Sequence, residues 1–441
     1  MSSLSGKAST YKNQILKILS KTSKDIQASF HLNISNGLTV NCRSGELENI
    51  ENQNDTGLSI EVFNNNRKGT ASTNDLSLDS IEKTLSKASN IAKHTQADSF
   101  QGLPSESYIK EESGNLGIYF PVDIKMDEII ELTKSCEAAA FEKDDRIKNS
   151  EGSSFTKSEN ETMLLNSEGL FGYYKSTHYS LSCIVLANEG DSMERDYWYS
   201  STREFNKLEH AREVGQRAAS RASSRLNAKP ISSRVCPVIF PPEVATSLIG
   251  NLLSGINGHS IYKKSSFLID SLGKDIFPEF VCITENPDIP NAMGSRPFDD
   301  DGVLTQKKNI IEKGRLMTFL LDTYSARKLN EKCTGNGVIT NITVESKKNK
   351  NANLIKMVDE GIIITEMMGS GANLLTGDYS RGAFGFYFKD GEIKYPVTGI
   401  TVASNLTQMF KNILEIGSDV DFRGNIRTGS ILVDNVTIGG T

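Results

Sequence analysis

The sequence is poor in cysteine, proline and tryptophan, and these shortages exclude several classes of protein. Its six cysteines are spread over 441 residues without any C-x-x-C pair, which excludes a zinc ribbon and a thioredoxin-like redox site. Eleven prolines beside 35 glycines exclude collagenous and proline-rich chains. Because no apolar run approaches the ~18 residues needed to span a bilayer, we expect no membrane partner.

The chain also lacks an excess of positive charge. Its 49 basic and 55 acidic residues give a net charge of −6, so no sequence-wide field attracts nucleic acid, and we expect no nucleic-acid partner. The first residues lack the basic start and apolar stretch of a secretory signal. Scattered cysteines are typical of a reducing compartment, so together these features favour a cytoplasmic location.

Hydrophobic periodicity predicts an α+β protein, in which an N-terminal α/β region of strands and helices precedes a larger, mainly antiparallel β domain. We expect three domains: an α/β domain at 1–112, a central α/β domain at 120–228 and a β-rich domain at 235–441. The main boundary is AKPISSR (228–234), where proline, serine and basic residues separate a helix from a new apolar strand. Apolar residues at helical spacing predict helices at 10–22, 80–94, 126–141, 207–226 and 242–256.

Alternating apolar residues predict short strands between these helices. FHLNIS (30–35) and LTVNC (38–42) are expected as separate strands, because an Asn-Gly pair lies between them. Two hairpin turns are expected further along, at NSEG (166–169) and NEGD (188–191).

Four arginines, Arg212, Arg217, Arg221 and Arg225, decorate the helix predicted at 207–226. They could contact an anionic partner. We favour a solvated helix face, because charge runs on helices most often face water. The favoured interpretation gives them no function.

The residues alone reveal no catalytic constellation. The five histidines lie more than 30 positions apart, so the H-E-x-x-H motif of a metalloprotease helix is absent. GSGANLLTG (369–377) lacks the third glycine of a dinucleotide-binding loop, and GDYSRGA (377–383) lacks the Lys-Ser/Thr pair of a P-loop. The acidic cluster at 299–301 could hold a cation, but a turn is favoured because a glycine follows it. Residue patterns therefore leave the function open.

A string of long phrases runs through the C-terminal half. They are YKKSSFLIDSLGK (262–274), RPFDDDGVLTQKKNIIEKGRL (296–316), LDTYSARKL (321–329), CTGNG (333–337), ITEMMGSGANLLTGDYSRGAFGFYFKDGEIKYPV (364–397), ITVASNLTQMFKNI (400–413) and NIRTGSILVDNVTIGG (425–440). Their order and wording resemble the TldD/PmbA family and, within it, the PmbA (TldE) branch. STHYSLSCIV (176–185) and MERDYWYS (193–200) also fit, so the resemblance covers most of the chain.

The resemblance implies a role as a partner subunit. In this family a TldD-type chain and a PmbA-type chain pair into a heterodimeric metalloprotease that acts on unfolded peptides, including leader removal from modified peptides. The TldD-type chain carries H-E-x-x-x-H on a helix and a late cysteine, which bind zinc. We therefore expect a TldD-type paralogue as partner, unfolded peptides as substrates and zinc in that partner. The family label "modulator of DNA gyrase" gains no support from this acidic chain.

The zinc positions of the TldD-type branch can be placed on this sequence through that resemblance. There the zinc helix is followed by a G-x-x-G and a basic pair, which match GING (255–258) and KK (263–264) here. Counting back puts the metal-ligand positions on Ile249 and Ser254 and the general-base position on Gly250. Since an aliphatic chain, a lone hydroxyl and a glycine cannot form a zinc site, we expect no metal, cofactor or catalytic residue in this chain.

Two alternatives stay open. The chain could be a binding or scaffold protein without a TldD-type partner, or a hydrolase with an unrecognised site, for which Ser380 or Cys333 would supply the nucleophile. Within the family phrases, Asp378, Tyr379 and Arg381 form a candidate substrate or interface loop. The same string also suits a simple turn, with an ion pair between Asp378 and Arg381.

Overall fold

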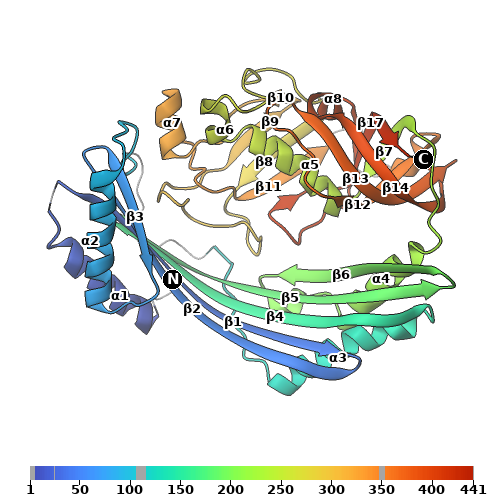
Figure 1. Ribbon diagram of the computed structural model, residues 1–441, viewed down its shortest axis with the longest axis horizontal. Coiled ribbons are helices and arrows are strands. Elements are labelled where there is room, and N and C mark those ends of the chain that lie inside the picture. The colour runs from blue at the N-terminus through green and yellow to red at the C-terminus, as the bar shows by residue number, and fades with distance from the viewer. Residues whose placement is uncertain (1–4, 24, 106–115, 347–352, 441) are drawn as a thin grey trace.

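The computed structural model describes residues 5–23, 25–105, 116–346 and 353–440. It has two parts: a long curved sheet formed by the N-terminal half, and a β-rich C-terminal part that lies over one face of that sheet (Figure 1). The expected α+β class is confirmed, because the α/β region precedes a mainly antiparallel β-rich domain. None of the helices in these ranges is long and apolar enough to cross a membrane.

The N-terminal half forms one six-stranded antiparallel sheet with the order β3-β2-β1-β4-β5-β6. Its strands are β1 (Gln27–Arg43), β2 (Glu46–Asn64), β3 (Arg67–Thr73), β4 (Ile147–Asn166), β5 (Phe171–Glu189) and β6 (Ser192–Thr202). The four longest have 17 to 20 residues, and a strand of this length extends for about 60 Å. The turns predicted at 166–169 and 188–191 join β4 to β5 and β5 to β6, so both are confirmed.

β1 passes without interruption through the Asn-Gly pair at which the sequence predicted a break. The prediction of two strands, at 30–35 and 38–42, is therefore wrong. Asn36 pairs with Asn54 of β2 on one side and with Glu159 of β4 on the other. Pairing on both sides overrides the weak strand propensity of Asn and Gly.

In the described part of the N-terminal half, four helices pack on this sheet, and two of them begin away from the predicted residues. The helices are α1 (Gly6–Leu19), α2 (Leu78–His94), α3 (Met126–Lys143) and α4 (Ala211–Ser224), with a 3-10 turn η1 (Phe205–Lys207) before α4. α1 begins earlier than expected, because the Ser5 hydroxyl caps its first turn by accepting a hydrogen bond from the Ala8 amide at 3.1 Å. α4 begins later than expected, because the His210 ring caps its N-terminus.

One face of the sheet carries two hydrophobic cores. Side chains alternate along a strand, so the even-numbered residues of β1 point to the same face. Phe30 and Leu32 belong to the core with α1 and α2, whereas Val40 and Cys42 belong to the core with α3 and α4. The opposite face, with polar side chains such as Asn33, is the face over which the C-terminal part lies.

The regions expected as domains at 1–112 and 120–228 contribute strands to this same sheet. Each region supplies one helix pair, and each pair has its own core. The three-domain division stays a prediction.

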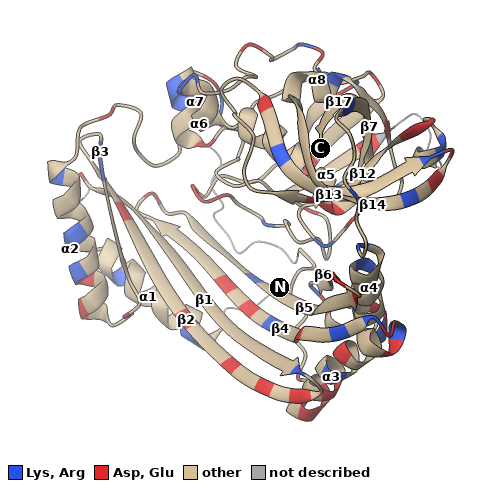
Figure 2. Cartoon of the chain, turned by 45° about the vertical axis from the view of Figure 1, so that its right-hand side comes forward, with Lys and Arg blue, Asp and Glu red and all other residues tan. Residues whose placement is uncertain are grey.

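The outer edge of β2 is only partly covered. β3 pairs with it from Leu58 onward, and no other strand of the described chain pairs with that edge between Glu46 and Gly57. The residues from Glu46 to Asp55 are all exposed, and this run holds four acidic side chains and no basic one, which appear as red bands along β2 (Figure 2). Like charges on an open edge disfavour pairing between two copies of it.

The C-terminal part contains two sheets, ordered β10-β9-β8-β11-β16 and β14-β13-β12-β7-β17-β15. Its strands are β7 (Arg234–Phe240), β8 (Val281–Asn286), β9 (Lys308–Glu312), β10 (Arg315–Leu316), β11 (Asn341–Ser346), β12 (Glu360–Met368), β13 (Asp378–Lys389), β14 (Glu392–Asn405), β15 (Ile413–Ile416), β16 (Ile426–Arg427) and β17 (Ile431–Gly439). Its helices are α5 (Pro242–Gly255), α6 (Gly258–Tyr262), α7 (Thr323–Leu329), α8 (Leu406–Lys411) and the 3-10 turn η2 (Leu354–Lys356). β14 also pairs with β17, which closes β14, β13, β12, β7 and β17 into a ring.

α5 is buried in the core that joins these two sheets. Its Leu248 and Leu252 belong to one hydrophobic cluster with Ile283 and Ile342 of the first sheet and Val402 of the second. A helix surrounded in this way is fixed in rotation, because turning it would expose apolar residues on one side. α5 therefore offers a rigid base for any side chain on its remaining open strip.

Local contacts attach the C-terminal part to the long sheet. Phe298 packs with Leu164 and Leu170 near the β4–β5 turn. Arg327 of α7 donates three hydrogen bonds to backbone carbonyls in the segment 100–103. A third attachment, an ion-pair cluster between α4 and β12, is described with the site.

Replacing Phe298 with alanine tests the first attachment. Phe298 is 1% exposed, and its ring meets the Tyr174 ring edge-on at 5.4 Å. We expect Phe298→Ala to lower the free energy of unfolding by about 3–5 kcal/mol, because it removes a buried ring and leaves a cavity. Urea denaturation followed by circular dichroism measures this change in the free energy of unfolding.

Leu272→Ala is the control for this experiment, since Leu272 is 46% exposed. It should change the free energy of unfolding by less than about 0.5 kcal/mol. Equal effects of the two substitutions would show that Phe298 does not anchor the C-terminal part.

Candidate functional site

α5 carries the positions at which the family resemblance expects a zinc site. Leu248 and Ile249 are buried in the core, whereas Ser247, Gly250 and Ser254 lie on the opposite strip of the helix, which reaches the surface. Their spacing of three and four residues places these three on one helix face. The expected ligand positions are therefore split between the core and the open strip.

These positions do not fit a zinc ion. Ile249 is 0% exposed and has no donor atom, and Ser254 offers one hydroxyl. Gly250 has no side chain, and a Cβ at that position would meet no atom within 4 Å. Zinc in proteins takes three or four nitrogen, sulfur or carboxylate ligands. Within the described ranges no group of three or more His, Cys, Asp or Glu is placed to hold a metal ion, and the expectation that this chain carries no metal stays a prediction.

The candidate residues Asp378, Tyr379 and Arg381 open strand β13. Tyr379 is 2% exposed, and burial raises the pKa of its hydroxyl, while the nearby Arg381 and Ser247 of α5 oppose that shift in its pKa. Tyr379 and Arg381 therefore point toward α5. Asp378 and Ser380 alternate with them and lie exposed on the other face of the strand.

No ion pair joins Asp378 to Arg381, so that part of the turn interpretation is wrong. Asp378 accepts hydrogen bonds from the Thr376 hydroxyl at 2.7 Å and from the Asn405 amide at 3.3 Å. Arg381 donates to the Met367 carbonyl at 3.4 Å. Because the two side chains leave the strand in opposite directions, they cannot grip one ligand group together.

Arg381 faces a cavity of about 330 Å³ between the two parts of the protein. β6, α5, β12 and the C-terminal end of α4 supply its other walls, among them Arg225, Glu243 and Glu366. The Arg381 Nε and the Thr365 hydroxyl are both buried and have no hydrogen-bond partner within the described chain. The guanidinium of Arg381 is therefore not fully hydrogen-bonded within the described chain.

Arg221 of α4 and Arg225, which caps the C-terminus of this helix, line the same cavity, and for them the prediction of a solvated helix face is wrong. Arg225 is 8% exposed and lies 2.6 Å from Glu366 Oε2 and 3.4 Å from Asp196 Oδ2. Arg221 lies 2.8 Å from Glu243 Oε1 and 3.3 Å from Asp196 Oδ1. These pairs tie α4 and β6 of the first part to α5 and β12 of the second.

Arg221 and Arg225 are ion-paired rather than solvated because of where the C-terminus of α4 lies. That end of the helix lies at the junction of the two parts, where a cation meets carboxylates from both. Arg212 and Arg217, nearer the helix start, have side chains that are 47% and 52% exposed, as a solvated face predicts. Burial opposes the charge of Arg225, but the hydrogen bond and charge of Glu366 outweigh burial, so the pKa of Arg225 is raised.

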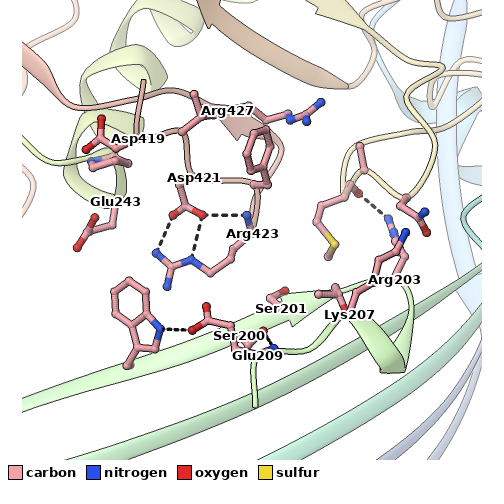
Figure 3. Close-up of a pocket in the computed structure, with 18 of the residues that line it drawn as sticks. Ser200, Ser201, Arg203, Lys207, Glu209, Glu243, Asp419, Asp421, Arg423 and Arg427 are labelled. Atoms are coloured by element: carbon pink, nitrogen blue, oxygen red, sulfur yellow. Dashed lines mark hydrogen bonds and ion pairs between the residues drawn. The ribbon is translucent and has the colours of Figure 1, made fainter. Parts of the chain in front are cut away.

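A larger cavity of about 490 Å³ lies on the other side of Glu243, between the same two parts (Figure 3). The long sheet contributes the end of β6 and the η1 turn. The C-terminal part contributes the segments 290–293 and 419–427. This cavity and the smaller one share Glu243 at the start of α5.

An aromatic and ionic network lines this larger cavity. Arg423 pairs with Asp421 at 2.8 Å, donates to the Tyr199 carbonyl at 3.0 Å and lies 4.0 Å from the centre of the Trp198 ring. The indole nitrogen of Trp198 donates to Glu209 at 3.2 Å. The network holds the segment around Arg423 against β6.

Sequence reasoning did not identify this cavity. Its members come from segments more than 200 positions apart, as the contact between Arg423 and Tyr199 illustrates. The one usable signal was the tryptophan of the phrase MERDYWYS, because Trp198 is the single tryptophan of the chain. Its position within a family phrase did not indicate what it contacts.

The residues suggested for an independent hydrolase, Cys333 and Ser380, gain no support. Burial raises the pKa of the Cys333 thiol to about 11, so the reactive thiolate is scarce at neutral pH. Its sulfur lies 3.5 Å from the Leu321 carbonyl. Within the described chain no histidine is hydrogen-bonded to Cys333 or to Ser380, and such a base is what activates a nucleophile.

The acidic cluster at 299–301 is a turn, as favoured from the sequence. Asp299 accepts hydrogen bonds from the amides of Asp301, Val303 and Gly337. Burial and the charge of Asp301 raise the pKa of Asp299 to about 6. Its carboxylate is committed to holding the loop.

Three family models match this chain. They are described as PmbA/TldA metallopeptidase domain 1, central domain and C-terminal domain, and they match residues 32–92, 120–226 and 233–440. Metalloprotease PmbA of Escherichia coli O157:H7 is 42% identical to this chain over 92% of its length and 90% of the relative. The Metalloprotease PmbA homolog of Haemophilus influenzae is likewise 42% identical over 92% and 90%.

Solved structures share the whole fold. A Bacteroides thetaiotaomicron protein described as a modulator of DNA gyrase superposes with a TM-score of 0.92 at 28% identity, over 100% of both chains. TldE from Thermococcus kodakarensis superposes with a TM-score of 0.85 at 20% identity, over 98% of this chain and 100% of that one, which supports the fold alone. The matches define a protein of the metallopeptidase class. Within that class, this chain belongs to the PmbA branch of the TldD/PmbA family.

The junction between the two parts gives a testable prediction. Replacing Arg225 with methionine removes one of the two cations that neutralise the buried carboxylate of Asp196, which is 5% exposed. The substitution also removes the ion pair with Glu366. We expect Arg225→Met to lower the free energy of unfolding by about 3 kcal/mol. Arg212→Met on the same helix removes only an exposed pair and should cost about 0.5 kcal/mol. If chemical denaturation shows similar losses in the free energy of unfolding for the two variants, the junction is not held by buried ion pairs.

The raised pKa of Cys333 gives a second testable prediction. Alkylation requires the thiolate, so its rate should rise about tenfold per pH unit between pH 7 and 9.5 without a plateau, as a pKa of about 11 demands. Mass spectrometry after iodoacetamide treatment measures the rate, and Cys333→Ser identifies the signal. A plateau below pH 9 would show an activated thiol and revive the hydrolase alternative.

Proposed function

We propose that this chain is the non-catalytic subunit of a heterodimeric zinc metalloprotease whose TldD-type paralogue holds the zinc. One feature supports the proposal: in this chain of a metallopeptidase family, the resemblance places Ile249, Gly250 and Ser254 at the ligand and base positions of the zinc-bearing branch. In the partner, the zinc would supply the activated water for peptide hydrolysis. This chain would hold the peptide and enclose the reaction.

Unfolded peptides fit this role better than folded proteins. An extended peptide can pair with a strand edge through main-chain hydrogen bonds, which require no particular side chain. Holding a peptide near a reactive centre by itself lowers a barrier by several kcal/mol. The substrates of the proposed complex are therefore unfolded peptides, as in leader removal or peptide degradation.

Arg381 is the side chain that we assign to substrate capture. Arg381 lines the smaller cavity beside α5, and its buried Nε has no hydrogen-bond partner among the described residues. A peptide carbonyl or carboxylate placed there would accept a hydrogen bond from it. Asp378 lies exposed on the other face of β13, where a contact with the partner subunit is the compatible role.

The acidic edge of β2 is a surface compatible with the association. Glu46–Gly57 has no strand on its outer side within the described chain, and both of its faces are exposed up to Asp55. A partner strand with basic side chains would satisfy its backbone groups and its charge. We place the complex in the cytoplasm, in keeping with the free cysteines of this chain.

Mixing this chain with its TldD-type paralogue tests the proposal. We expect cleavage of an unstructured fluorogenic peptide by the mixture and none by this chain alone. Size-exclusion chromatography should show a heterodimer, and elemental analysis should assign the zinc to the paralogue. Replacing the motif Glu of the paralogue with Gln should abolish cleavage, since the proposed complex has no other general base.

Variants of this chain serve as matched controls. Ser380→Ala and Cys333→Ala should leave cleavage by the mixture essentially unchanged, whereas Arg381→Ala should lower it about tenfold through loss of a charge-assisted hydrogen bond. Chelator-insensitive cleavage by this chain alone would replace the proposal with an independent hydrolase. Absence of any complex with the paralogue would favour a separate binding protein.

A further inference from the structure

The larger cavity holds charges of both signs, and its acidic groups are already satisfied. Asp421 pairs with Arg423 at 2.8 Å, and Glu243 pairs with Arg221 at 2.8 Å. Asp419 accepts hydrogen bonds from the amide and the hydroxyl of Ser430. These carboxylates have no need of a bound cation.

Two arginines at the other end of the same cavity lack such partners. Arg203 donates only to the backbone carbonyls of Thr177 and Met293, and its buried Nε has no partner within the described chain. The guanidinium of Arg427 lies 4.5 Å from the centre of the Phe422 ring. Among the residues that the structure describes, no carboxylate lies within ion-pair distance of either guanidinium.

In Figure 3 the guanidinium of Arg427 lies at the top of the view and Arg203 at the right, both away from Asp419 and Glu243 at the left. Lys207 lies below Arg203 and pairs with Glu204 at 3.1 Å. This end of the cavity therefore has positive charge without matching negative charge.

Burial makes this arrangement costly in the absence of a ligand. The pKa of Arg203 and the pKa of Arg427 are both lowered by burial. Carbonyl dipoles and a ring face compensate a buried cation less well than a carboxylate does. An anion that enters the cavity would therefore supply the compensating negative charge that the free protein lacks.

The cavity also has the size and the apolar walls of a small-molecule site. Its volume of about 490 Å³ falls in the range of ligand pockets, which combine apolar walls with a few polar anchors. Trp198, Pro242, Pro290 and Phe422 supply apolar wall area. The expected ligand is an apolar body with a single anionic end.

We propose that the Arg203–Arg427 end of this cavity binds the terminal carboxylate of a short peptide, whose side chains lie against the apolar wall. The inference rests on the proposed function, because it assigns one end of the peptide substrate or product to a place in this chain. It sets a preference for peptides with a free C-terminus. An amide or an internal segment of a longer chain would leave both guanidiniums uncompensated.

The single tryptophan of the chain provides the readout. Trp198 lines the cavity, so its fluorescence should change when a ligand enters. The full chain is titrated with the peptide Ala-Ala-Phe-Leu as the free acid, with its C-terminal amide and with inorganic phosphate, and isothermal calorimetry repeats each titration. We expect the acid to bind at least tenfold more tightly than either of the other two.

Arg427→Gln is the decisive variant, since the side chain of Arg427 makes no hydrogen bond that holds the fold within the described chain. It should weaken binding of the acid about tenfold or more and leave the already weak binding of the amide unchanged. Arg212→Gln is the matched control, because Arg212 pairs with Glu142 outside the cavity, and it should bind as the unchanged chain does.

The possible outcomes separate this inference from the proposed function. Equal binding of acid and amide, or tighter binding of phosphate than of the acid, would overturn the carboxylate site even if the mixture with the paralogue cleaves peptides. Selective, Arg427-dependent binding of the acid would support the site even if the cleavage assay with the paralogue fails.

Discussion

The alternation of side chains along four very long strands is the constraint on which this structure depends. Every second residue of β1 is apolar over most of its length, and the face so formed is covered by two helix pairs. The intervening residues leave the opposite face polar, with too little apolar area for a continuous second core. The C-terminal part therefore rests on that face through separate local contacts, and the two cavities lie at this junction.

At the junction ion pairs hold the two parts together, whereas hydrophobic packing holds each part together internally. Asp196 and Arg225 are almost fully buried, and Arg225 pairs both with Asp196 and with Glu366 of the other part. Asp196 also pairs with Arg221, which in turn pairs with Glu243 of the other part. Buried ion pairs add little net stability because desolvation offsets their attraction, but they penalise any arrangement that separates them. We interpret the cluster as setting the relative position of the two parts, and so the width of both cavities.

Much of the fold followed from local patterns. Helical spacing located α2, α3 and α5, and turn residues located the β4–β5 and β5–β6 hairpins. Continuity of β1 through Asn36 could not be predicted, because it depends on neighbours distant in sequence. The same holds for the site: the burial of Arg225, and the lack of a carboxylate partner for Arg203 among the described residues, depend on which segments meet at the junction. Family phrases located α5 and β13 but not the contacts between them.

The central position of β1 also affects the order of events during synthesis. β1 pairs with β2, its immediate successor, but its other edge pairs with β4, which lies about 100 residues later in the chain. A nascent chain emerging from the ribosome would hold that inner edge open for several seconds, at elongation rates of about 5–20 residues per second. Long-range pairing of this kind is slow and leaves hydrophobic residues such as Phe30 and Val40 vulnerable to aggregation. The half of the protein made first is thus the half that most needs protection by chaperones until β4 arrives.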